Sequence, residues 1–255
     1  MKTIIKALFL LVALTLSVPI FAQSDFEATK ARAEAGDATA QFSLGKMYAN
    51  GEGVAQNDPE AVKWFRMAAD QGLAEAQSLV GMMYDLGRGA AEDDQEAAKW
   101  YRLAAEQGDA RAQYNLGMMH EVGVGLSQNS REAVTWYRLA AEQGMVEAEF
   151  NLGRMYSSGN GVAQNDQEAA KWYGFAARQG HANAQVLLAQ MYLTGVGVAE
   201  NLLLSYVWTS MSATNGFSGA AVVRDMFRDL LSTQELQQAQ EMAARCFESN
   251  FKDCD

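Results

Sequence analysis

The sequence predicts an all-α solenoid of about five 36-residue helix-turn-helix repeats, with a helical cap at each end. The first observation is a glycine that recurs every 36 residues, at Gly36, Gly72, Gly108, Gly144, Gly180 and Gly216. The second is that all five tryptophans fall 28 residues after such a glycine, at Trp64, Trp100, Trp136, Trp172 and Trp208. We expect these tryptophans to form the structural core, because units this short bury their apolar faces only by stacking on one another.

The first 22 residues predict a secretory signal peptide. Lys2 and Lys6 supply a positive start, and residues 7–18 form an apolar run of 12, shorter than the roughly 20 residues that cross a bilayer. A small-residue cleavage site ends at Ala22. We therefore expect a periplasmic or secreted protein with no lipid anchor and no membrane insertion after cleavage. The alternative is an uncleaved anchor.

The rest of the chain divides at the repeat glycines. Residues 23–35 are predicted to form an N-terminal capping helix, and residues 216–255 a degenerate C-terminal capping repeat without the tryptophan. Between them we expect five repeats, over residues 36–71, 72–107, 108–143, 144–179 and 180–215. Terminal units with polar outer faces keep a solenoid soluble.

Each repeat is predicted to contain two helices. In the first repeat the apolar spacing favours helices over roughly residues 40–48 and 59–71. Asp58 and Pro59 resemble an N-cap followed by proline at the first helical position. Gly72 would then end the second helix.

Glycines also recur in phase within the repeats. A pair such as Gly51 and Gly53 lies between the two helices of every repeat, where positive φ angles allow a tight connection. Gly45 and its equivalents lie inside the first helix of four repeats, although glycine there costs about 1 kcal/mol relative to alanine. We therefore expect another helix to cross closely at these positions.

Charge and motifs exclude several classes of function. The formal charge is −11, and removal of the leader with its two lysines leaves 18 basic against 31 acidic residues, or −13. This balance argues against nucleic acid and anionic membranes as partners. The histidines, His120 and His181, show no zinc-ligand spacing, and no nucleophile motif occurs. We therefore expect no catalytic residue, metal or cofactor, and interpret His120 as a packed aromatic at a position where other repeats have tyrosine.

The third repeat carries a family resemblance. Its residues are Ala112-Gln113-Tyr114-Asn115-Leu116-Gly117-Met118-Met119, Gly123-Val124-Gly125, Glu132-Ala133, Trp136-Tyr137 and Ala140-Ala141-Glu142-Gln143-Gly144. This pattern resembles the Sel1-like repeat, a relative of the tetratricopeptide repeat, over about residues 36–215. The resemblance implies a right-handed α/α solenoid of a secreted bacterial type. The fifth repeat departs from the pattern at Ala189, where the family has glycine, and at Leu204-Ser205, where it has Glu-Ala.

The resemblance also implies a non-catalytic scaffold or adaptor that binds a protein or peptide on a concave face formed by the first helices. Positions seven, ten and thirteen residues after the repeat glycine vary between repeats and would point into that face. The candidate contact residues are Lys46, Met82, Met118, Arg154, Gln190, Asn115 and Asn151. The alternative is a cell-wall-directed ligand binder or hydrolase, because some secreted relatives are described as penicillin-binding or β-lactamase-like.

Both cysteines lie in the C-terminal segment. Cys246 and Cys254 are eight residues apart, so a disulfide between them would pin the tail to the last helix in an oxidising compartment. Intermolecular pairing and free thiols are the alternatives.

Overall fold

The computed structural model describes residues 20–251 and residue 254. In that part of the chain it contains thirteen α-helices and no strand, which confirms the predicted all-α fold. Residues 1–19 of the predicted signal peptide lie outside the described residues. The first helix, α1, spans Ile20–Glu34 and so begins ahead of the predicted N-terminal cap. None of the described helices has both the length and the apolarity to traverse a bilayer.

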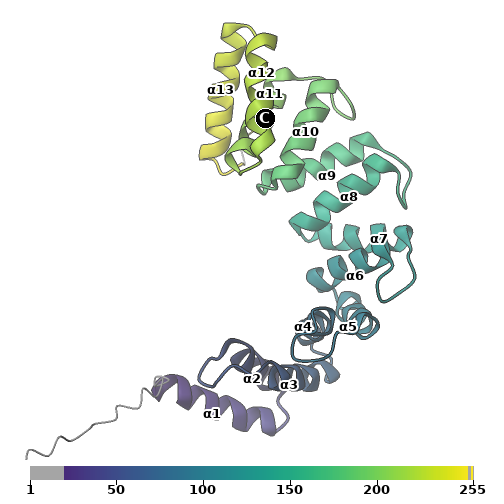
Figure 1. Ribbon diagram of the computed structural model, residues 1–255, viewed down its shortest axis with the longest axis vertical. Helices are drawn as coiled ribbons and strands as arrows, with labels where there is room; N and C mark the ends of the chain where they lie inside the picture. The colour runs from purple at the N-terminus through teal and green to yellow at the C-terminus, as the bar shows by residue number, and fades with distance from the viewer. Residues whose placement is uncertain (1–19, 252–253, 255) are drawn as a thin grey trace, which may run out of the picture.

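Ten helices form the five predicted repeats. The first helices are α2 (Ala38–Asn50), α4 (Ala74–Asp85), α6 (Ala110–Val122), α8 (Val146–Ser158) and α10 (Ala182–Thr194). The second helices are α3 (Asp58–Asp70), α5 (Asp94–Glu106), α7 (Ser130–Glu142), α9 (Asp166–Arg178) and α11 (Leu202–Thr214). The pairs stack into an open arc with α4 and α6 on its inner side and α5 and α7 on its outer side (Figure 1). In the middle of the arc the first helices therefore lie on the concave side (Figure 1).

The predicted N-cap of the second helix is wrong by one residue. Asn57 is the cap, because its backbone is extended and its side-chain oxygen accepts the Glu60 N–H at 3.1 Å. Asp58 is instead the first helical residue, with Pro59 after it. The same position caps the second helix of the other repeats, through Asp93, Asn129, Asn165 and Asn201.

The glycines inside the first helices make room for aromatic rings. A Cβ atom added to Gly117 would lie 2.8 Å from Cδ1 of Tyr137, which comes from the second helix of the same repeat. The expected close contact is therefore present, and its partner is a ring. The other pairs are Gly45 with Phe65, Gly81 with Tyr101 and Gly153 with Tyr173.

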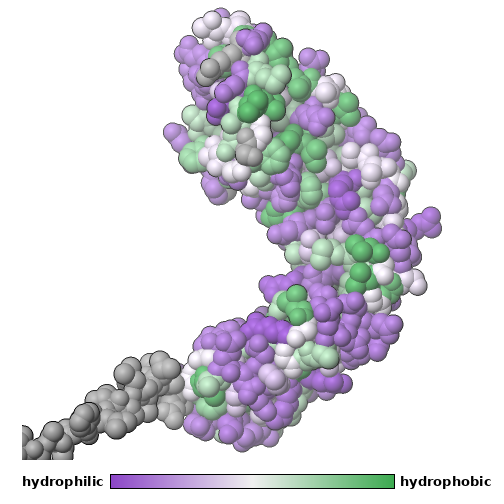
Figure 2. Space-filling view, viewed as in Figure 1, coloured by the Kyte–Doolittle hydropathy of each residue, from purple (hydrophilic) through white to green (hydrophobic). Residues whose placement is uncertain are grey.

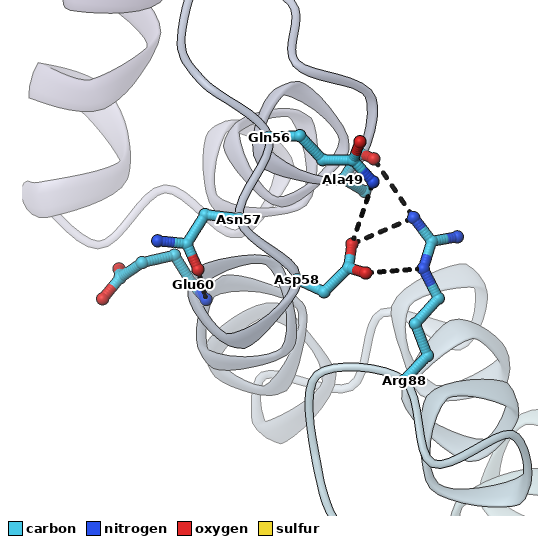
Figure 3. Close-up of polar contacts among 6 residues, drawn as sticks. All are labelled: Ala49, Gln56, Asn57, Asp58, Glu60 and Arg88. Carbon is cyan, nitrogen blue, oxygen red and sulfur yellow. Dashed lines mark hydrogen bonds and ion pairs between the residues drawn. The ribbon is translucent and has the colours of Figure 1, made fainter.

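The connections between helices join successive repeats. Gly89 has a φ of +76°, and a Cβ there would collide with the Asp58 carbonyl oxygen of the preceding repeat. Beside it, Arg88 forms a bidentate ion pair with Asp58, with Nε–Oδ2 and Nη2–Oδ1 both at 2.9 Å (Figure 3). Arg88 Nη2 also donates to the Ala49 carbonyl at 3.3 Å. The guanidinium lowers the pKa of Asp58.

In four of the five repeats a buried amide connects the repeat to the helix before it. Gln77 Nε2 donates to the Ala69 carbonyl at 3.1 Å, and Gln107 Nε2 donates to Gln77 Oε1 at 2.7 Å. Gln41, Gln113 and Gln185 make the equivalent bonds to an alanine carbonyl. The fourth repeat has Glu149 at this position, 4% exposed.

The C-terminal cap consists of α12 (Ser218–Leu230) and α13 (Thr233–Glu248). α13 packs mainly against α11 and touches α12 little. Cys246 of α13 forms a disulfide with Cys254, and both residues are buried. The predicted disulfide is confirmed, and it ties the tail to the last helix.

Candidate partner-binding surface

Five of the candidate contact residues form one row of equivalent positions on the first helices of the five repeats. Lys46 lies on α2, Met82 on α4, Met118 on α6, Arg154 on α8 and Gln190 on α10, at equivalent positions. All are exposed except Met82, which is half-buried. Because successive members come from successive repeats, a ligand along the row would contact each repeat in turn.

Arg154 is already paired within the protein. Its guanidinium forms an ion pair with Glu121 of α6, and Tyr137 Oη donates to the same carboxylate at 2.8 Å. The Glu121 side chain is 16% exposed, against 45% for Arg154. Burial and the Glu121 carboxylate raise the pKa of Tyr137, so the phenol stays protonated and remains a donor. A partner carboxylate would meet an arginine whose charge is partly compensated.

Asp85 is held by Tyr101 in the way that Glu121 is held by Tyr137. Tyr101 Oη donates to Asp85 Oδ2 at 3.3 Å. Burial raises the pKa of Asp85, and this hydrogen bond opposes the rise. Both acids lie thirteen residues after a repeat glycine, at a position that the repeat pattern predicts to point into the concave face.

A pairing within the repeats links these acids to their tyrosine partners. The residue thirteen after the glycine is an acid or serine where the packed ring is tyrosine, and it is apolar where the ring lacks a hydroxyl or is absent. The pairs are Ala49 with Phe65, Asp85 with Tyr101, Glu121 with Tyr137, Ser157 with Tyr173, and Leu193 with Thr209. The hydroxyl of a buried phenol needs a hydrogen-bond partner, which explains the correlation.

Asn115 and Asn151 are half-buried and contact tyrosine hydroxyls. Asn115 lies beside the Tyr101 hydroxyl, and Asn151 lies beside the Tyr114 hydroxyl. Each amide opposes the rise in tyrosine pKa that burial causes. Each asparagine therefore lies close to the hydroxyl of a tyrosine on another helix.

The chemistry of the row changes along the arc. Near its N-terminal end, Lys46 Nζ lies 5.5 Å from the centroid of the Phe42 ring. In the middle, Met118 is 37% exposed and Met82 packs against the buried cluster around Tyr101. Thioether side chains adapt readily to irregular apolar partners. Hydrophobic side chains gather again at the C-terminal end of the arc, over α10 to α12 (Figure 2).

That C-terminal region contains an apolar pocket of about 380 Å³ between α10, α11 and α12. Gln190, the last residue of the contact row, lies on its rim with Leu193. Ala189 and Thr209 form part of its wall. The volume is near the lower end of the roughly 300–1,000 Å³ of ligand pockets.

The tryptophans differ in burial. Four are buried, and Trp208 is completely so, whereas Trp136 is half-buried. Trp100 Nε1 donates to Glu96 Oε1 at 3.1 Å. Among the described residues the other four indole N–H groups have no hydrogen-bond partner. Their contribution is therefore one of packing.

The two histidines lie apart from the contact row. His120 is buried, neither ring nitrogen has a hydrogen-bond partner in the described chain, and burial lowers its pKa. His181 is the N-cap of α10, and its Nδ1 accepts the Ala184 N–H at 3.1 Å. Over residues 20–251 and 254, no three side chains of the His, Cys, Asp and Glu types are grouped so as to hold a metal ion.

Comparison with known proteins gives a match along most of the chain. The model of the Sel1 repeat family matches five consecutive segments, residues 38–73, 74–109, 110–145, 146–181 and 182–217. A comparison with curated protein sequences gives no match.

Two solved structures are similar over most of the described fold. A protective antigen of uropathogenic Escherichia coli that displays an SLR fold is 37% identical, with a TM-score of 0.81 over 91% of this chain and 50% of that one. A Sel1 repeat protein from Oxalobacter formigenes is 32% identical, with a TM-score of 0.70 over 79% of this chain and 58% of that one. The chain thus spans between half and three-fifths of these relatives.

Proposed function

Because this chain belongs to the Sel1 repeat family, we propose that it is a non-catalytic scaffold that binds a protein or peptide on its concave face. The observation that carries the proposal is the contrast between two sets of residues. Side chains that pack one repeat on the next recur, such as the glutamines that are buried in four of the five repeats, whereas the contact row varies from lysine through two methionines to arginine and glutamine. A surface that varies on a constant frame suits the recognition of one extended ligand.

The polarity of the row indicates the kind of ligand. Lys46 and Arg154 bring two positive groups to an otherwise acidic protein, and Met82 and Met118 lie between them. An extended segment with an acidic residue at each end and apolar residues between would match this order. Glu121 lies beside Arg154 and repels an acidic residue of the ligand that is placed one repeat too early. It therefore fixes which residue of the ligand meets which repeat.

We also propose that the chain acts outside the cytoplasm. The leader predicts export, and the disulfide between Cys246 and Cys254 is a bond that oxidising compartments maintain. Fractionation of cells that express the full chain tests this point. Mature protein in the periplasm or the medium is the expected result, and a full-length cytoplasmic protein with reduced cysteines would contradict it.

Affinity capture with matched variants tests the binding surface. The tagged mature chain is compared with Lys46→Gln/Arg154→Gln on the concave face and with Lys63→Gln/Lys171→Gln on the second helices. Each variant loses two positive charges, and all four side chains are exposed. We expect a partner from periplasmic or medium fractions to be lost only by the concave variant. Equal capture by all three proteins would contradict the proposed surface.

A further inference from the structure

The apolar pocket at the C-terminal end occupies the place of a missing aromatic ring. In the first four repeats a ring from the second helix covers the glycine of the first helix. In the fifth repeat the glycine is replaced by Ala189 and the ring by Thr209. A Cβ at the glycine position of the other repeats would lie 2.6–2.8 Å from the ring, so the alanine methyl excludes a ring placed as in those repeats.

The pocket wall offers apolar surface and no free charge. Its lining includes Val186, Leu193 and Val223, and no lysine, arginine, aspartate or glutamate. The hydroxyls are already bonded inside the fold, because Ser205 Oγ donates to the Ala189 carbonyl at 2.8 Å and Thr209 Oγ1 to the Ser205 carbonyl at 2.7 Å. Burying a neutral apolar group there leaves neither hydroxyl unsatisfied.

Apolar side chains continue from the pocket along α12. Val222, Met226 and Leu230 are 68%, 60% and 56% exposed. They remain uncovered because α13 packs against α11 instead of against α12. Figure 2 shows hydrophobic surface in this region, next to the concave side of the arc. A contiguous apolar surface of this kind marks an interaction site.

We propose that this pocket is the anchor site for an aromatic side chain of the bound peptide. The other four repeats of this chain indicate the occupant, because each fills the equivalent space with a phenyl or phenol ring. The ring enters from the concave side and stacks on the Ala189 methyl, next to Gln190 at the end of the contact row. Apolar residues that flank it contact Val222 and Met226 of α12. This inference rests on the proposed function, because it names the ligand group that the last repeat selects.

Methyl NMR with small amino-acid amides tests the anchor site without a known partner. N-acetyl-phenylalaninamide and N-acetyl-alaninamide are titrated into the mature chain, and the methyl signals of Ala189, Leu193 and Thr209 are followed. We expect shift changes with the phenylalanine compound only. Equal effects of the two compounds, or none with either, would overturn the proposal.

A variant that restores the ring supplies the decisive control. Ala189→Gly/Thr209→Phe rebuilds the Gly45–Phe65 pair of the first repeat, whose neighbour Ala49 is apolar as Leu193 is, so it should fold and fill the pocket with its own ring. The remaining pocket methyls, such as that of Leu193, should then no longer respond to the phenylalanine compound. Ala189→Gly alone leaves the pocket open and should keep the response. Unchanged binding by the double variant, with a preserved thermal transition, would refute the site.

The same variant separates this inference from the proposed function. A partner that depends on Lys46 and Arg154, yet binds the ring-restored variant as tightly as the native chain, refutes only the anchor site. A partner that is insensitive to the contact row contradicts the proposed function, whatever the pocket binds. A partner weakened by both variants supports both.

Discussion

Arg154 of α8 forms an ion pair with Glu121 of α6, so that the fourth repeat is joined to the third. The pair is partly exposed, and pairs of this kind contribute about 0–1 kcal/mol to folding. Arg154→Gln should therefore lower the free energy of unfolding by no more than about 1 kcal/mol. Urea denaturation measures this change. A much larger loss would mean that the arginine serves the fold and not the surface.

Glu149 should destabilise the fourth repeat at neutral pH. It accepts a bond from Gln179 at 2.8 Å, but an ionised carboxylate cannot donate to the preceding helix as the glutamines of the other repeats do. Glu149→Gln should raise the free energy of unfolding by about 1 kcal/mol at pH near 7. The control is Glu147→Gln, an exposed acid on the same helix, which should change little.

The gain from Glu149→Gln should depend on pH. Burial raises the pKa of Glu149 in the folded protein. The protonated acid is thus favoured by folding, and its contribution is present at low pH and lost as the pH rises through the folded pKa. The advantage of the variant should shrink toward the unfolded pKa of about 4.3. Denaturation curves at several pH values test this, and a gain independent of pH would contradict the account.

His120→Tyr should remove a loss of stability in acid. Tyr84 and Tyr156 hold this position in neighbouring repeats, and each accepts a bond from an arginine of the preceding helix, Arg66 or Arg138. In the third repeat the arginine is Arg102, and its charge adds to burial in lowering the pKa of His120. Tyrosine should restore the missing hydrogen bond.

The direction of this pH effect on stability follows from the lowered pKa of His120. The unfolded chain binds the proton more tightly than folded His120 does, so native stability falls as the pH drops below about 6.5. His181 also has a lowered pKa and remains in the variant, so the effect appears in the difference between the two proteins. A thermal transition with the same pH dependence in both proteins would contradict the prediction.

The tryptophans should differ in how much they contribute to the free energy of unfolding. Trp208 is completely buried in the cluster of the last repeat, and Trp208→Ala should cost about 3–5 kcal/mol. Trp136→Ala should cost less, because Trp136 is only half-buried. Chemical denaturation of the two variants measures the difference. An equal loss of unfolding free energy in both variants would contradict the prediction that the more buried tryptophan contributes more.

The repeat spacing predicted the fold because it places the same residues at the same position in every unit. Gly36 and Trp64 are enough to set the phase, and Gly117 indicated a close contact before its partner was known. The sequence pattern assigns the N-cap to Asp58, whereas the structure has Asn57 there. Both residue types cap helices well, so only the backbone angles decide between them.

The candidate surface was harder to predict. The pairing of Glu121 with Arg154 joins residues 33 positions apart, and it depends on how far one repeat is displaced from the next. The change at Ala189 was visible in the sequence, but the pocket follows only when Thr209 is known to lie over it. Local patterns fix helices, whereas contacts between repeats require the stacking geometry.

Binding of a defined ligand to the concave face is the central claim, and titration calorimetry tests it most directly. The captured partner, or the segment of it that binds, is titrated into the native chain, Lys46→Gln/Arg154→Gln and Lys63→Gln/Lys171→Gln. We predict a loss of at least tenfold in affinity, or about 1.4 kcal/mol, for the concave variant alone. The same Kd for all three proteins, or a loss confined to the Lys63 and Lys171 variant, would contradict the account.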